Sequence, residues 1–175
     1  MCSSDPGSMS SGSRYNDLID SMDYILSDRA SADLLQFTDD DLVDVIPFSY
    51  AADEVWNSAN NLERENILSK IKNRNPGGGT ALYPSVVEAL KLLNKEDSSK
   101  YHTSVIVMTD GEGNIGSFEE LKKYYKESKS IPVYSIQFGD ASVEQLNKIS
   151  ELTNGKVFDG TTNLIDAFME VRGYN

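Results

Sequence analysis

Two short loops in this 175-residue sequence contain residue types that can bind a metal ion. The first, Gly-Gly-Gly-Thr at 77–80, offers the hydroxyl of Thr80 behind three glycines that let the backbone come close to an ion. The second, Thr-Asp-Gly at 109–111, offers the carboxylate of Asp110. Hard divalent cations prefer oxygen ligands in an octahedron and usually keep several waters. One carboxylate, one or two hydroxyls and waters would therefore make a Mg²⁺ site.

The strands expected around these loops are short apolar runs. Residues 104–109, SVIVMT, form such a run without polar alternation, as expected of a parallel strand that helices cover on both faces. We therefore predict this strand at the centre of a sheet, with Asp110 directly at its end. Other strands are predicted at 42–48, 52–58, 131–138 and 156–158, and the one at 52–58 is expected to be a short edge strand.

Helices are expected where apolar residues recur at steps of three and four. This spacing predicts one helix over 15–26 and another after Thr80, in which Pro84 is tolerated because it lies in the first turn. A serine followed three residues later by Glu or Gln predicts helix starts at Ser117 and Ser142. The remaining helices are predicted over 62–72 and 164–171.

Strands that alternate with helices imply right-handed crossovers and a mainly parallel sheet between two helical layers. The predicted fold class is therefore α/β, doubly wound and Rossmann-like. In such sheets ligands bind beyond the carboxyl ends of the strands. The loops that carry Thr80 and Asp110 suit that position.

The composition limits the classes of partner. Twenty-eight acidic and sixteen basic residues give a net charge of −12, which repels nucleic-acid phosphates and anionic membrane surfaces. No apolar run reaches the roughly 18 residues of a membrane-spanning helix. We therefore expect no nucleic-acid partner and no direct membrane insertion.

The segments GGGTALYPSVVEAL around Thr80 and VIVMTDGEGN around Asp110 resemble two elements of the von Willebrand factor type A family. The metal-ion-dependent adhesion site of that family combines a DxSxS motif after the first strand with a Thr in a second loop and an Asp in a third. The resemblance covers about residues 15–175. It implies that Mg²⁺, or Mn²⁺ or Ca²⁺, binds here and that an acidic side chain of a protein partner completes its coordination. The closing segment KVFDGTTNLIDAFMEVRGYN resembles bacterial A domains and implies a larger bacterial protein.

The first element of the motif departs from the family pattern. Aligning Gly-Ser-Met at 7–9 with the end of the motif places Ser8 on its last serine, but Pro6 on the first serine and Ser4 on the aspartate. Asp5 lies one residue from the expected place and would substitute if the loop shifts. The predicted metal ligands are Asp5, Ser8, Thr80 and Asp110.

Residues 1–14 are rich in Ser and Gly, and we interpret them as a flexible leader or a degenerate metal-site loop before a domain at 15–175. They contain no counterpart of the apolar strand that precedes the first motif at the centre of the family's sheet. Buried backbone groups left unpaired by a missing strand cost about 1 to 3 kcal/mol each. We therefore expect this chain either to be less stable than an intact A domain or to take a strand from a second chain or another segment.

Three classes of function remain open. The first is a metal-ion-dependent protein-binding module for adhesion or assembly, and the second is a structural domain of the same family with an inactive metal site. The third is a phosphate- or nucleotide-binding enzyme, since a glycine loop that opens a helix can hold phosphate. The P-loop pattern needs Lys and then Ser or Thr after its last glycine, whereas Thr80 and Ala81 follow Gly79. No Ser, Cys or His can be placed beside an orienting base, so we expect no enzymatic activity.

Overall fold

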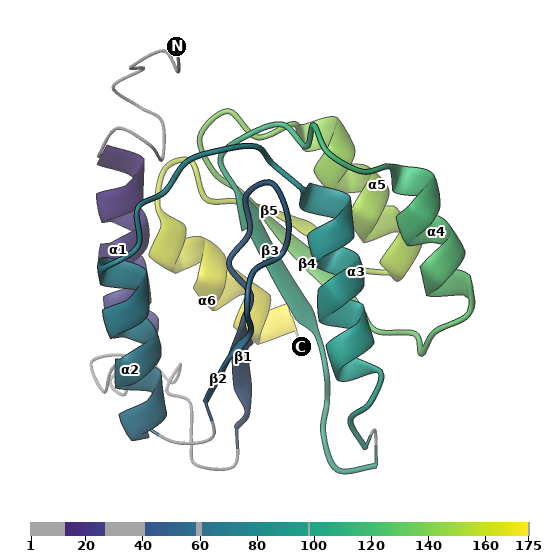
Figure 1. The fold of residues 1–175 in the computed structure, drawn as a ribbon, viewed down its shortest axis with the longest axis horizontal. Helices are drawn as coiled ribbons and strands as arrows, with labels where there is room; N and C mark the ends of the chain where they lie inside the picture. The colour runs from purple at the N-terminus through teal and green to yellow at the C-terminus, as the bar shows by residue number, and fades with distance from the viewer. Residues whose placement is uncertain (1–12, 27–40, 59–60, 98, 175) are drawn as a thin grey trace.

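A computed structural model describes residues 13–26, 41–58, 61–97 and 99–174 (Figure 1). A parallel sheet has the strand order β3-β4-β5, and a separate antiparallel sheet pairs β1 with β2. The strands are β1 (Val43–Val45), β2 (Trp56–Ser58), β3 (Val105–Thr109), β4 (Val133–Gln137) and β5 (Val157–Asp159). The helices are α1 (Ser13–Leu26), α2 (Asn61–Lys72), α3 (Leu82–Leu93), α4 (Phe118–Lys126), α5 (Val143–Thr153) and α6 (Leu164–Tyr174).

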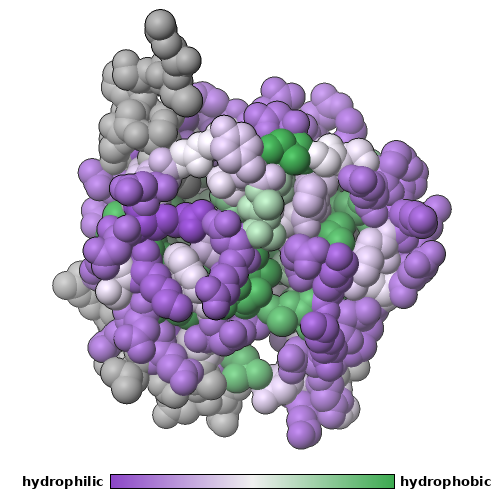
Figure 2. Space-filling model, viewed as in Figure 1, coloured by the Kyte–Doolittle hydropathy of each residue, from purple (hydrophilic) through white to green (hydrophobic). Residues whose placement is uncertain are grey.

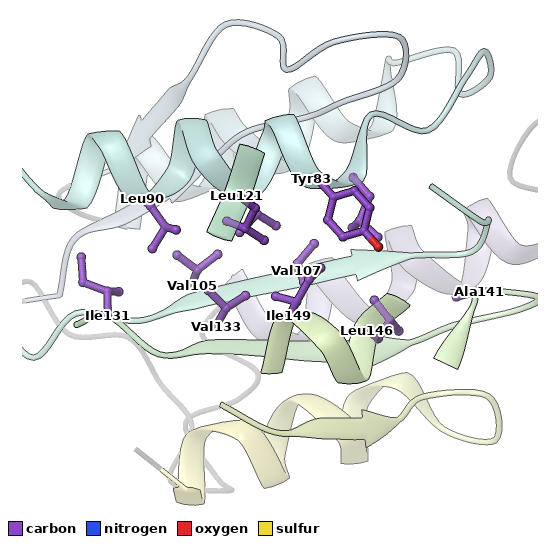
Figure 3. Packing of buried hydrophobic residues seen from close by; sticks show 12 residues of the cluster. Tyr83, Leu90, Val105, Val107, Leu121, Ile131, Val133, Ala141, Leu146 and Ile149 are labelled. Carbon is purple, nitrogen blue, oxygen red and sulfur yellow. The ribbon is translucent and has the colours of Figure 1, made fainter. Parts of the chain in front are cut away.

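Helices cover both faces of the parallel sheet. On one face, α3, α4 and α5 enclose a buried cluster that includes Val107, Leu121 and Val133 (Figure 3). On the opposite face, α6 packs on the sheet through a second cluster that includes Ile136 of β4 and Val171 of α6. The alternation of side chains along a strand produces this division, since successive residues point to opposite faces. The predicted α/β fold, with a mainly parallel sheet and helices on both faces, is confirmed.

The β1–β2 hairpin belongs to a third cluster that it shares with α1 and α2. Leu26 of α1 and Ile67 and Ile71 of α2 are buried there, and Val43 and Trp56 of the hairpin pack against them. Both hairpin strands are shorter than the runs that predicted them. The first half of the described chain is thus held together by its own apolar contacts.

The two predicted serine caps differ in their hydrogen bonds. At the start of α4, Ser117 accepts a bond from the Glu120 amide and the Glu120 carboxylate accepts one from the Ser117 amide, so this capping box is confirmed. At the start of α5, Ser142 accepts from the Gln145 amide. The Gln145 side chain does not return the bond, because it binds Gly113 in the loop after β3.

The predicted central position of residues 104–109 is wrong for the sheet that the structure describes. In that sheet β4 lies in the middle and β3 lies at one end. Ile106 of β3 is accordingly 37% exposed, although it belongs to the most apolar run of the sequence. An apolar run indicates that both faces of a strand are covered by helices. It does not indicate how many neighbouring strands the strand has within the sheet.

Gly155, just after α5, provides a test of how α5 packs on the sheet. A Cβ added there would lie 1.9 Å from the carbonyl oxygen of Val133 in β4. We expect Gly155→Ala to lower the free energy of unfolding by at least about 2 kcal/mol, because the obstacle is backbone within a strand pair. Urea unfolding measures the change.

The neighbouring residue supplies the control for this substitution. Asn154 already has a positive φ of 55°, a conformation that glycine adopts freely. Asn154→Gly should therefore change the free energy of unfolding by less than about 1 kcal/mol. Equal unfolding midpoints for wild type and Gly155→Ala would contradict the close packing of α5 on β4.

Candidate metal site

The loop before α3 and the loop after β3 are joined by a reciprocal pair of hydrogen bonds. The Thr80 amide donates to Oδ1 of Asn114 at 2.9 Å, and the Asn114 amide donates to the Thr80 carbonyl oxygen at 3.0 Å. These bonds satisfy backbone groups that lie outside any helix or strand. They fix the position of Thr80 relative to the end of β3.

Thr80 lies beside the residue that follows Asp110. A Cβ built on Gly111 would be 3.3 Å from Oγ1 of Thr80, so the Thr80 hydroxyl sits directly over the backbone of Gly111. The structure thus brings the loops of two predicted ligands, Thr80 and Asp110, to the carboxyl end of β3. Asp5 and Ser8 lie outside the described residues.

The loop after β3 is held on two further sides. Oγ1 of Thr109 accepts from the Gly111 amide at 3.2 Å, and the Asp140 amide donates to the Asp110 carbonyl oxygen at 3.1 Å. The Gln145 side chain accepts from the Gly113 amide at 2.7 Å and donates to the Gly113 carbonyl oxygen at 2.9 Å. The backbone on both sides of Asp110 is therefore fixed before any ligand arrives.

Close contacts and backbone conformation explain why glycine occupies positions 78 and 79. Gly78 has a φ of 109°, which side chains rarely adopt, and a Cβ there would lie 3.0 Å from the Tyr50 ring. A Cβ on Gly79 would lie 2.7 Å from Cδ1 of Ile115. Tyr50 itself is 70% exposed although it covers these glycines. Its ring therefore presents a large apolar surface to solvent next to Thr80.

An ion pair and a buried phenol lie near these loops. Arg14 of α1 forms an ion pair with Asp140 at 2.9 Å, and its guanidinium fills the space beside Gly139. In the first turn of α3, burial raises the pKa of Tyr83, Lys148 opposes the rise, and the acidic groups of Glu144 and Glu112 add to it. The Tyr83 phenol therefore stays neutral at physiological pH.

Several of these residues were not found by sequence reasoning. Asn114, Gln145 and Tyr50 act through contacts with residues distant in the chain, and no local pattern marks such contacts. An Asn in a glycine-containing loop and a Gln in the first turn of a helix are both common, so residue type alone carried no signal for Asn114 or Gln145. Tyr50 follows a predicted strand, where an aromatic residue is ordinarily interpreted as packing.

The described donors suit a hard cation but do not fill its coordination shell. Thr80 and Asp110 offer a hydroxyl and a carboxylate, which are oxygen ligands of the kind Mg²⁺ takes together with waters. Within the described ranges, no group of three or more His, Cys, Asp or Glu side chains is placed to hold a metal ion. The other two predicted ligands, Asp5 and Ser8, lie outside those ranges.

Solved structures with the same fold include von Willebrand factor type A proteins. The chain is similar to a von Willebrand factor type A protein from Catenulispora acidiphila, with a TM-score of 0.70, 17% identity, and coverage of 90% of this chain and 37% of that one. It is also similar to proximal thread matrix protein 1 from the mussel byssus, described with a zinc-occupied MIDAS motif, with a TM-score of 0.62, 17% identity, and coverage of 90% and 42%. At this identity the likeness shows the fold alone.

A curated relative covers a shorter stretch. The chain is 28% identical over 105 residues to the probable bifunctional E2/E3 enzyme R795 of Acanthamoeba polyphaga mimivirus, which is 56% of this chain and 8% of that protein. The chain therefore spans less than a tenth of this relative and less than half of the solved chains above.

The family comparison covers most of the chain. The model of the von Willebrand factor type A domain matches residues 10–166, which include α1 through β5, the glycine loop and the loop after β3. This range agrees with the fold and with the resemblance of the segments around Thr80 and Asp110. The chain belongs to the von Willebrand factor type A domain family.

Proposed function

We propose that this domain is a protein-binding module whose partner supplies an acidic side chain to a divalent cation. The cation is held by Thr80 and Asp110, with Ser8 and Asp5 as the further ligands. The observation that carries the proposal is the reciprocal hydrogen-bond pair between Thr80 and Asn114, which places the Thr80 hydroxyl beside Gly111. Fixed loops favour binding of a cation, because binding then has to order little additional backbone and costs less free energy.

Charge explains why the module needs the cation. The chain has a net charge of −12, so an acidic partner is repelled over long distances. A bound cation is the largest local charge in its site and reverses the sign of the field there. Tyr50, exposed beside the glycine loop, adds an aromatic contact of the type enriched at protein interfaces. The partner is therefore a protein with a Glu or Asp beside an apolar patch.

Mg²⁺ is the ion we propose, with Mn²⁺ and Ca²⁺ as alternatives, because the donors are oxygens. The zinc-occupied MIDAS motif of the mussel protein supports divalent binding by a domain of this fold. The similarity to parts of longer chains supports a place within a larger protein, and adhesion or assembly is the role that we propose for the domain there. Within the described ranges every helix is too short or too polar to cross a bilayer.

A structural domain with an inactive metal site is the second candidate. It is favoured by the small number of ligands, since the described part of the site contributes only one hydroxyl and one carboxylate and no wider acidic or histidine cluster. Metal affinity separates the two candidates, because only the first requires a cation to bind.

We propose that the domain is not an enzyme. Its glycine loop departs from the phosphate-binding pattern, since Thr80 and Ala81 follow Gly79. The E2/E3 activity in the name of the mimivirus relative refers to a much longer protein, and this chain covers only 8% of it.

The first test of the site is calorimetric titration with Mg²⁺ and Mn²⁺. We expect binding weaker than micromolar, because Ser4 and Pro6 occupy two ligand positions of the family motif, and we expect Thr80→Ala or Asp110→Ala to abolish it. Glu119→Gln, in the exposed first turn of α4, is the control and should leave binding unchanged. Binding that survives both site substitutions would show that the cation lies elsewhere, and no binding to wild type would favour the structural candidate.

The second test concerns the loop after β3. Gln145→Ala removes both hydrogen bonds to Gly113, each worth about 1 kcal/mol, so the Gly113 amide should exchange hydrogen at least about fivefold faster and Mn²⁺ should bind more weakly. Lys148→Ala, which removes only an exposed ion pair on the same helix, should change neither quantity. Unchanged exchange at Gly113 in Gln145→Ala would show that Gln145 does not position this loop.

The third test is a search for turnover. With ATP or a generic phosphoester and saturating Mg²⁺, the release of phosphate should not exceed the buffer rate, because the sequence predicts no Ser, Cys or His beside an orienting base. Phosphate release that disappears in Asp110→Ala would overturn the assignment as a binding module.

A further inference from the structure

The turn that follows β4 holds the backbone of Asp110. Beyond the last paired residues of β3 and β4, the Asp140 amide donates to the Asp110 carbonyl oxygen at 3.1 Å. The Ala141 amide closes the turn by donating to the Phe138 carbonyl oxygen at 3.3 Å. Gly139, within the turn, has a positive φ of 54°, a conformation that glycine adopts freely. A contact that fixes this turn therefore also fixes the backbone at Asp110.

Arg14 of α1 covers this turn with its guanidinium. A Cβ built on Gly139 would lie 2.6 Å from Nη1, 2.8 Å from Cζ and 2.9 Å from Nε of Arg14. Because these three atoms are coplanar and almost equidistant from that point, the point lies above the guanidinium plane and not at its edge. Nη2 of the same side chain donates to Oδ2 of Asp140 at 2.9 Å. One arginine thus packs on one residue of the turn and forms an ion pair with the next.

The packing of α1 explains why Arg14 reaches the turn. Leu18 lies four residues after Arg14, so the two side chains share one face of the helix. Leu18 packs against the cluster on the α6 side of the sheet, and this cluster includes Phe138. Arg14 lies one helical turn earlier on the same face and meets Gly139, the residue after Phe138.

The Arg14 side chain is less exposed than the side chains of an ordinary surface ion pair. It is 21% exposed, whereas Lys122 and Glu119 form a pair on α4 in which the side chains are 41% and 78% exposed. Figure 2 shows that the surface over α4 is mainly hydrophilic. Exposed pairs contribute little because water and salt screen them, and partly buried pairs are screened less. Lysine would not reproduce the flat contact, since its ammonium is a point charge on a flexible stem.

We propose that Arg14 is a positioning residue for Asp110. Its guanidinium holds Gly139 and Asp140 in place, and the Asp140 amide then holds the carbonyl oxygen of Asp110. The effect of Arg14 on a bound cation rests on the proposed function, whereas its effect on the turn does not. Charge and position act in opposite directions, because a positive side chain repels a nearby cation but a fixed loop favours cation binding. Removing Arg14 therefore separates the two effects by the sign of the change in cation affinity.

The first readout is hydrogen exchange at the Asp140 amide in EDTA, which is independent of the metal. Arg14→Gln removes the ion pair and the flat contact and should accelerate exchange at this amide at least about fivefold. Arg14→Lys keeps the charge but not the flat contact, and should still accelerate exchange at least about threefold. Lys72→Gln, which removes an ion pair between α2 and Asp23 of α1, is the control and should leave exchange at Asp140 unchanged.

The second readout is the Mn²⁺ affinity in calorimetric titration at low salt. Loss of a positive charge alone would strengthen Mn²⁺ binding, whereas loss of the fixed loop should make binding by Arg14→Gln at least about threefold weaker than by wild type. Tighter Mn²⁺ binding by Arg14→Gln, unchanged exchange at Asp140 in this variant, or a wild-type exchange rate in Arg14→Lys would each overturn the proposal. If wild type binds no Mn²⁺, the proposed function fails, and exchange at Asp140 alone decides the role of Arg14.

Discussion

The site depends on the paired hydrogen bonds between Thr80 and Asn114. These two residues are 34 positions apart, and each contributes its backbone amide, so neither bond forms until α3 and β3 are packed together. Once they form, the Thr80 hydroxyl and the Asp110 loop occupy one place at the carboxyl end of β3. The two loops that carry the predicted ligands Thr80 and Asp110 therefore come together only as a consequence of the tertiary fold.

The loops at the carboxyl end of β3 also contact α1. Arg14 of α1 forms an ion pair with Asp140, whose amide donates to the Asp110 carbonyl oxygen. The described chain contains one well-packed half, built on β3, β4 and β5, and a second half in which α1, α2 and the hairpin form their own cluster. Strand pairing between the halves is missing among the described residues.

Local patterns in the sequence predicted the elements that have local causes. The spacing of apolar residues predicted α1 and α3, and the serine with a glutamate three residues later predicted the start of α4. Local patterns gave wrong or incomplete predictions where contacts with residues distant in the chain determine the structure. The apolar run of β3 suggested a central strand, but its place in the sheet depends on which strands are available as neighbours. Gln145 fitted a capping pattern, yet its side chain binds Gly113, 32 residues away, because the tertiary contact competes with the local one.

The sequence predicted which loops carry the candidate ligands, but not the contacts that bring these loops together. Thr80 and Asp110 were marked by their loops and by the order of elements, whereas Asn114 carried no signal, because its role exists only after the loops meet. The metal-binding roles of all four predicted ligands stay predictions, and two of them, Asp5 and Ser8, lie outside the described ranges.

The most direct measurement of the central claim, that the two loops form one metal site, is an NMR titration with substoichiometric Mn²⁺, whose unpaired electrons broaden nearby resonances. We expect the amide resonances of Thr80 and Gly111 to broaden together and before any others in the described chain. Broadening that begins at the acidic surface of α4, while Thr80 and Gly111 stay sharp, would contradict the claim.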